Sequence, residues 1–152
     1  MIHRSLIAVL LALLLTGCGD EDGSEPPNLP TEGLLLEYSR AGGLAFSIYE
    51  VRIDADGSGT VATGSDLEQL DRQSFELDDA ELAELTDVLA ANPISDFPKA
   101  ANEDCPDAFG YTFAYGGEEY TYNGCDENPE GATAVRSTLA RLPVPPDDPV
   151  GG

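Results

Sequence analysis

The sequence predicts an α+β domain in which a mainly antiparallel sheet is packed on one face by two helices and held by one disulfide. Three observations support this prediction. Short stretches with strand-like alternation are interrupted by two helical patterns, a Gly-Gly pair divides two aromatic stretches, and two cysteines flank that pair. Strands grouped in this way, without regular strand–helix alternation, are typical of α+β domains.

The first part of the domain is predicted to form strands. Residues 34–40 are expected to form a strand that ends at the glycine-rich turn 41–43. Apolar residues then alternate through 44–54, with one step in the pattern that indicates a second strand with a bulge. A turn is predicted at 54–59, and a return strand begins at 60–63. The polar stretch that follows has a weaker pattern.

The clearest helix follows Leu77. Asp78 is a good N-cap, and Glu81, three residues later, completes the pattern of a capping box. Asn92-Pro93 is expected to end the helix. One apolar stripe recurs at helical spacing, formed by Leu82, Leu85, Val88 and Leu89.

A β-hairpin is predicted around Gly116-Gly117, because two glycines suit a two-residue primed turn. Counting back from this turn pairs Thr112 with Thr121 on one face. On the other face it pairs Phe113 with Tyr120 and Tyr111 with Tyr122. This aromatic face could form a ligand platform, but side chains at alternating positions of a paired hairpin more often belong to the core, so burial is expected.

A second helix is predicted from Asn128 as N-cap and Pro129 as first helical residue, and it is expected to end at Pro143. Its apolar stripe consists of Ala132, Val135, Leu139 and Leu142. The whole chain is thereby divided into a signal peptide (1–17), an acidic disordered tether (18–32), a single α+β domain (33–143) and a Pro-rich flexible tail (144–152).

The N-terminus has a short basic start, an apolar run over residues 6–15 that is too short to span a membrane, and two small residues directly before Cys18. This order resembles the lipobox of bacterial lipoproteins. The resemblance implies that residues 1–17 are removed and that Cys18 carries a thioether-linked diacylglycerol and a further acyl chain, such as palmitate, on its amine. Two or three chains anchor stably, since each buried methylene contributes about 0.8 kcal/mol.

The residue after the cysteine is Gly19, whereas the retention signal of inner-membrane lipoproteins places an aspartate there. The lipoprotein resemblance therefore implies a lipid-anchored protein of the cell envelope, at the outer membrane or cell surface rather than at the inner membrane.

Charge and histidine content restrict the function. The formal charge is −22, from 29 acidic against 7 basic residues, so nucleic acid would be repelled by the surface as a whole. His3 is the only histidine and lies in the segment that the lipobox removes. The mature chain then lacks the base of a Ser-His-Asp or Cys-His nucleophile and the usual histidine metal ligand. A non-enzymatic protein without a resident cofactor is expected.

Three cysteines are present in all. With Cys18 assigned to lipid, Cys105 and Cys125 remain, and they are expected to form a disulfide in an oxidising compartment. Such a bond would stabilise the domain by roughly 3 kcal/mol. Zinc binding is the alternative, but two thiols without histidine make a poor zinc site.

One segment resembles the first half of a calcium loop. Asp54, Asp56 and Ser58 supply oxygens at the first, third and fifth positions, and Gly59 follows at the sixth. The twelfth position is Ser65, where a bidentate glutamate is required. A turn between two strands is the favoured interpretation, and calcium binding is the alternative.

Residues across 34–142 look similar to emfourin-type proteins. They are Tyr38-Ser39-Arg40-Ala41-Gly42-Gly43-Leu44-Ala45, the helix Leu77 to Leu89, Asp107 with Tyr111, and Asp126 with Pro129, Leu139 and Leu142. Emfourins inhibit thermolysin-like metalloproteases, so the resemblance implies a module that binds a secreted metalloprotease. The lipobox, the cysteine pair and the 56–72 insertion depart from the family pattern, and no inhibitory residue is assigned.

These observations predict a lipid-anchored, non-enzymatic binding module of the envelope, with a metalloprotease-binding or inhibitor-like role. The alternative is a calcium-binding envelope lipoprotein that uses the 54–58 loop.

Overall fold

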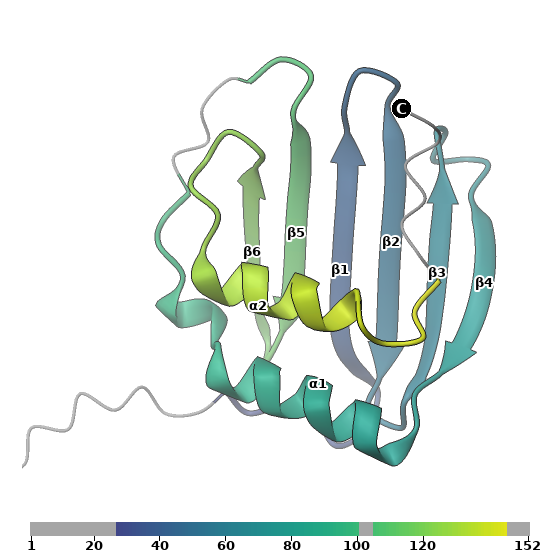
Figure 1. The fold of residues 1–152 in the computed structure, drawn as a ribbon, viewed down its shortest axis with the longest axis vertical. Coiled ribbons are helices and arrows are strands. Elements are labelled where there is room, and N and C mark those ends of the chain that lie inside the picture. Colours follow the sequence, from purple (N-terminus) through teal and green to yellow (C-terminus); the bar gives the residue numbers. More distant parts are fainter. Residues whose placement is uncertain (1–26, 101–104, 146–152) are drawn as a thin grey trace, which may run out of the picture.

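The computed structural model describes residues 27–100 and 105–145, and it confirms the predicted α+β class. One antiparallel six-stranded sheet carries both helices on the same face (Figure 1). Across the sheet the strands lie in the order β4 (Asp71–Glu76), β3 (Ser58–Gly64), β2 (Ser47–Asp54), β1 (Leu34–Gly42), β5 (Phe109–Tyr115) and β6 (Glu118–Asn123). The helices are α1 (Asp79–Ala91), the short 3₁₀ helix η1 (Ile94–Asp96) and α2 (Glu130–Leu139).

The first helix forms as predicted. The Asp78 carboxylate accepts hydrogen bonds from the backbone N–H groups of Ala80 and Glu81, at 2.9 Å each. In return, the Glu81 carboxylate accepts from the N–H of Asp78 at 2.8 Å, which completes the capping box. The second helix differs at its start, because Pro129 is the N-cap and makes no side-chain cap bond. Asn128, predicted to be the N-cap, precedes the helix instead.

Two features of the sheet differ from the predictions. Strand β4 was not expected, because its polar sequence at the sheet edge has no buried residue to produce an alternating pattern. The predicted strand over 44–54 begins only at Ser47, since residues 43–46 form the turn between β1 and β2. The irregularity predicted in β2 lies in β1 instead, where the register shifts between Leu34 and Leu36.

The core lies between the helices and the inner face of the sheet. Leu85 and Leu89 of α1, and Ala132 and Val135 of α2, are fully buried there, as their stripes predict. Residues on both sides of the predicted 33–143 domain contribute as well. Val144 is only 8 % exposed, and half-buried Leu29 packs against the same cluster.

Candidate functional site

The predicted disulfide between Cys105 and Cys125 is present, with the two Cα atoms 6.3 Å apart. It joins the loop before β5 to the loop after β6, at the open end of the hairpin, where the hairpin register places it. Cys18 lies outside the described residues. No helix in the described part of the chain is long and apolar enough to cross a membrane.

The aromatic face of the hairpin has the predicted register, Phe113 opposite Tyr120 and Tyr111 opposite Tyr122. Phe113 and Tyr122 are buried, whereas Tyr111 and Tyr120 are half-buried. The rings of Tyr111 and Tyr122 stack with centroids 4.9 Å apart. Burial raises the pKa of Tyr122, although Arg136 acts in the opposite direction. Phe113 and Tyr122 of this face therefore belong to the core, whereas Tyr111 and Tyr120 lie at its partly exposed edges.

The predicted calcium loop is the turn between β2 and β3. Asp54 ends β2, and the Asp56 carboxylate accepts from both the Oγ and the N–H of Ser58, at 2.6 and 2.9 Å. These hydrogen bonds lower the pKa of Asp56. Gly59 lies opposite Phe75 in the β3–β4 register, and a Cβ there would be 2.3 Å from the Phe75 ring, so packing explains this glycine.

Among residues 27–100 and 105–145, no group of three His, Cys, Asp or Glu side chains could hold a metal ion. Asp54 and Ser58 line a shallow depression of about 280 Å³ next to β4. Calcium binding by Asp54, Asp56 and Ser58 stays a prediction.

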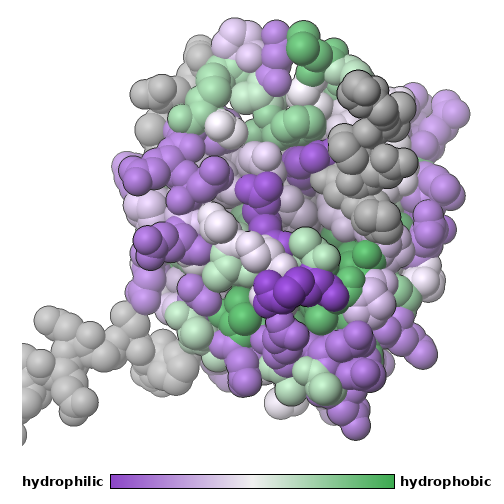
Figure 2. Space-filling view, in the orientation of Figure 1, coloured by the Kyte–Doolittle hydropathy of each residue, from purple (hydrophilic) through white to green (hydrophobic). Residues whose placement is uncertain are grey.

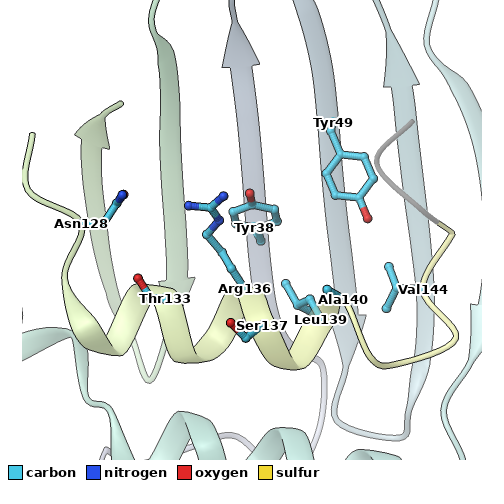
Figure 3. Close-up of a pocket in the computed structure, with 9 residues that line it drawn as sticks. All are labelled: Tyr38, Tyr49, Asn128, Thr133, Arg136, Ser137, Leu139, Ala140 and Val144. Atoms are coloured by element: carbon cyan, nitrogen blue, oxygen red, sulfur yellow. The ribbon is translucent and has the colours of Figure 1, made fainter. Parts of the chain in front are cut away.

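A larger hollow lies between α2 and the inner face of β1 and β2, with a volume of about 550 Å³. Figure 3 shows Tyr38 and Tyr49 projecting from the sheet, while Arg136 extends from α2 towards Tyr38. We call this feature the Tyr–Arg hollow, and its lining residues are Tyr38, Tyr49, Asn128, Thr133, Arg136, Ser137, Leu139, Ala140 and Val144.

Arg136 is the cation of the Tyr–Arg hollow. Its guanidinium lies over the Tyr111 ring, 4.6 Å from the centroid, and donates a long hydrogen bond of 3.5 Å to the Tyr122 hydroxyl. The side chain is half-buried, and no carboxylate of the described residues forms an ion pair with it. Among residues 27–100 and 105–145, no carboxylate lines the hollow either. An arginine on an aromatic face, facing an open space, is suited to binding an anion.

A second arginine stacks nearby on the same face of the sheet. Arg40 lies directly opposite Tyr49 on β2 and Tyr111 on β5. Its guanidinium is 4.2 Å from the centroid of the Phe109 ring, and its Nη2 donates to Ser47 Oγ at 3.3 Å.

The Gly42-Gly43 pair holds Phe109 in place. Both glycines have positive φ, +124° and +78°. A Cβ on Gly42 would lie 2.5 Å from the carbonyl oxygen of Ala108, and one on Gly43 would lie 2.7 Å from the Phe109 ring. The Arg40-x-Gly42-Gly43 sequence is thus explained by packing: the glycines admit the ring on which the arginine stacks.

The turn that follows the glycines exposes apolar side chains. Leu44 is 89 % exposed and Phe46 is 48 % exposed, contrary to the expectation that both lie on the apolar side of a strand. Phe46 also has a φ of +41°, a left-handed conformation that is unfavourable for a bulky residue. We call Leu44–Phe46 the apolar tip. Figure 2 shows apolar atoms at this end of the molecule, where Figure 1 places the β1–β2 turn.

Arg40 and the apolar tip occupy a part of the chain without acidic residues. Residues 38–49 and 108–117 contain no Asp or Glu, although the protein has 29 of them, and the two segments pair through β1 and β5. Sequence reasoning did not single out Arg40 or Tyr49 as site residues. The absence of Asp and Glu from these two segments is a signal in the sequence that could have identified them. The position of Arg136 next to them depends on the packing of α2.

No protein-family model matches this chain, and no curated protein matches it.

Proposed function

We propose that this protein is a lipid-anchored, non-enzymatic binding module of the cell envelope, and that it binds a protein partner through the apolar tip. The observation that carries the proposal is the exposure of Leu44 and Phe46 on a tight turn between two central strands. Rigidly supported loops are where binding residues concentrate in folded domains.

The energetics of the apolar tip favour binding. Burying one such side chain in a partner contributes about 1.5–3 kcal/mol, so Leu44 and Phe46 together could supply much of the energy of a specific contact. The left-handed conformation of Phe46 costs about 1–2 kcal/mol in the free protein. Backbone strain of this kind at an exposed residue is characteristic of binding sites.

The partner class comes from the emfourin resemblance. The segment Tyr38 to Ala45 that carries this resemblance includes the first part of the apolar tip, so a secreted thermolysin-like metalloprotease is the partner we propose. The segment that carries the tip, residues 38–49, contains no Asp or Glu, and this supports contact with a second protein because bringing carboxylates into an interface without partners is costly.

Attachment to the membrane is proposed from the lipobox, with Cys18 as the lipidated residue and the outer membrane or cell surface as the location. The Tyr–Arg hollow supports binding rather than catalysis, because its lining in the described part of the chain offers aromatic rings, hydroxyls and a guanidinium but no carboxylate, histidine or thiol to act as a general base.

The test is a peptide-hydrolysis assay of a thermolysin-like protease, titrated with a form of the protein that lacks residues 1–18. We expect inhibition that rises with domain concentration and is lost in the double variant Leu44→Ser, Phe46→Ser. Leu67→Ser is the matched control, since Leu67 is 69 % exposed in the β3–β4 turn and outside the apolar tip. Unchanged hydrolysis at a large excess of domain would overturn the inhibitor proposal.

A further inference from the structure

We propose that the Tyr–Arg hollow is a carboxylate-binding site, and that its occupant is the acidic segment 146–149 of the same chain, Pro146-Asp147-Asp148-Pro149. The proposal concerns a different surface from the apolar tip and does not require a protease partner.

Arg136 supplies the recognition chemistry. An arginine presents five N–H donors in a planar fork that matches a carboxylate. Within the described part of the chain, Arg136 makes one hydrogen bond, the long contact to Tyr122, and stacks on Tyr111. Most of its donors therefore point into the hollow or to solvent, where a carboxylate could accept charge-assisted hydrogen bonds.

The path of the chain supports the choice of occupant. Val144 is buried and lines the hollow, and the Tyr49 hydroxyl donates to the carbonyl oxygen of Pro145 at 2.9 Å. The rings of Tyr49 and Tyr38 are 6.2 Å apart between centroids, and both residues line the hollow together with Arg136. Two or three extended residues span about 7–10 Å, so Asp147 and Asp148 follow within that length of chain after Pro145, whose carbonyl already contacts Tyr49 at the edge of the hollow.

The amino-acid composition of segment 146–149 also supports it as the occupant of the hollow. Prolines on both sides of Asp147 and Asp148 favour extended backbone, which limits the entropy lost when the segment is ordered. A segment attached directly to the hollow is also present at an effective concentration of about millimolar or more. An acidic segment from another protein would instead have to approach a molecule of net charge −22.

Segment 146–149 in the hollow would compete with any other ligand for Arg136, because it is attached to the same chain. A carboxylate-bearing ligand from another molecule would have to displace segment 146–149 before it could reach Arg136, so the chain would restrict its own site to ligands that bind better than its own two aspartates.

Two forms of the protein test this, one covering residues 19–152 and one covering residues 19–145. The probe is a fluorescein-labelled peptide with the sequence of residues 146–152, and the readout is fluorescence anisotropy at low salt. We expect the peptide to bind the 19–145 form and to bind the 19–152 form at least about tenfold more weakly, since the tethered copy competes.

Two controls make the result specific. Arg136→Gln in the 19–145 form should weaken binding by about tenfold or more, as loss of a charge-assisted contact does. Arg141→Gln is the matched variant, since Arg141 lies just beyond the same helix, is exposed, and pairs with Glu84 outside the hollow. A peptide with both aspartates replaced by asparagine should lose binding to the 19–145 form that retains Arg136, and this control does not depend on whether the Arg136 variant folds.

Equal binding to the two forms would overturn segment 146–149 as the occupant. No binding to either form, or equal binding of the asparagine peptide, would overturn the carboxylate site. The double variant Leu44→Ser, Phe46→Ser should leave peptide binding unchanged, so failure of the protease assay and failure of this proposal are separate outcomes.

Discussion

Replacing Cys105 and Cys125 by serine should lower the free energy of unfolding by about 3 kcal/mol. The two residues are separated by 20 positions in the sequence. In the chain-entropy model, closing a loop of about this length restricts the unfolded chain by about 11 cal/mol/K, which is about 3 kcal/mol at 25 °C. The gain arises in the unfolded state, so its size depends on loop length more than on contacts made by the bond.

The folded state should tolerate the replacement, because other interactions hold the same region. The Asn123 side chain accepts from the N–H groups of Cys125 and Asp126, at 3.0 and 3.3 Å, and the N–H of Asn123 donates to the Asp126 carboxylate at 3.0 Å. The hairpin also keeps its register through backbone pairing along β5 and β6. The variant is therefore expected to fold, with a lower stability.

Urea denaturation followed by circular dichroism measures this change, and thermal unfolding should show a melting temperature about 10–20 °C lower. Reduction of the unmodified protein with dithiothreitol is the control and should reproduce the loss seen in the double serine variant. A loss below about 1 kcal/mol with an unchanged m value would refute the loop-entropy reasoning, and a loss well above about 5 kcal/mol would show that the bond supports native packing.

Four further predictions can be checked with standard measurements. Phe46→Gly should raise the free energy of unfolding by about 1 kcal/mol in denaturation experiments, because glycine adopts its φ of +41° without strain, and it should weaken any tip-dependent binding; a loss of stability would contradict the strain argument. Burial, together with Glu118, raises the pKa of Tyr115 above its ordinary value of 10.0, so the stability contributed by the neutral phenol is complete below about pH 10 and is lost as the pH rises towards the folded-state pKa. Tyr115→Phe should therefore reduce the alkaline loss of stability, and it should cost about 1 kcal/mol at neutral pH through the lost hydrogen bond to the Asn92 carbonyl; an unchanged pH profile would argue against this residue as the cause. Calcium titration by calorimetry should give no heat at millimolar concentration, since the Asp56 carboxylate is already engaged by the following turn, whereas measurable binding would favour the calcium alternative. Globomycin should cause a slower-migrating precursor to accumulate in the native host if Cys18 is lipidated, and the absence of a precursor would remove the anchor.

The parts of the fold that local chemistry determines could be predicted from the sequence. The hairpin register follows from counting outward from Gly116-Gly117, and the start of α1 follows from the reciprocal bonds of Asp78 and Glu81. Strand β4 could not be found in this way, because an edge strand is held by backbone pairing with β3 and needs no apolar alternation. Its only large apolar residue, Phe75, packs on Gly59 across the pair.

The candidate sites depended on tertiary structure. Leu44 and Phe46 fit an alternating pattern as well as any core residue, and only the turn geometry shows that they are exposed. The Tyr–Arg hollow joins Tyr49 of β2 to Arg136 of α2, and no local spacing relates residues so far apart in the sequence. The disulfide was predictable because only two cysteines remained once Cys18 was set aside.

The chain enters the domain and forms the apolar tip at opposite ends of the sheet. Leu29 packs on the core, and Pro27 lies against Gly116 in the β5–β6 turn. The apolar tip follows the far end of β1, whose nine residues span about 30 Å. In Figure 1 the two turns lie at opposite ends of the sheet. The described chain thus enters the sheet at the end opposite Leu44 and Phe46, which puts the apolar tip at the far end of the domain from the segment that the lipobox would attach to the membrane.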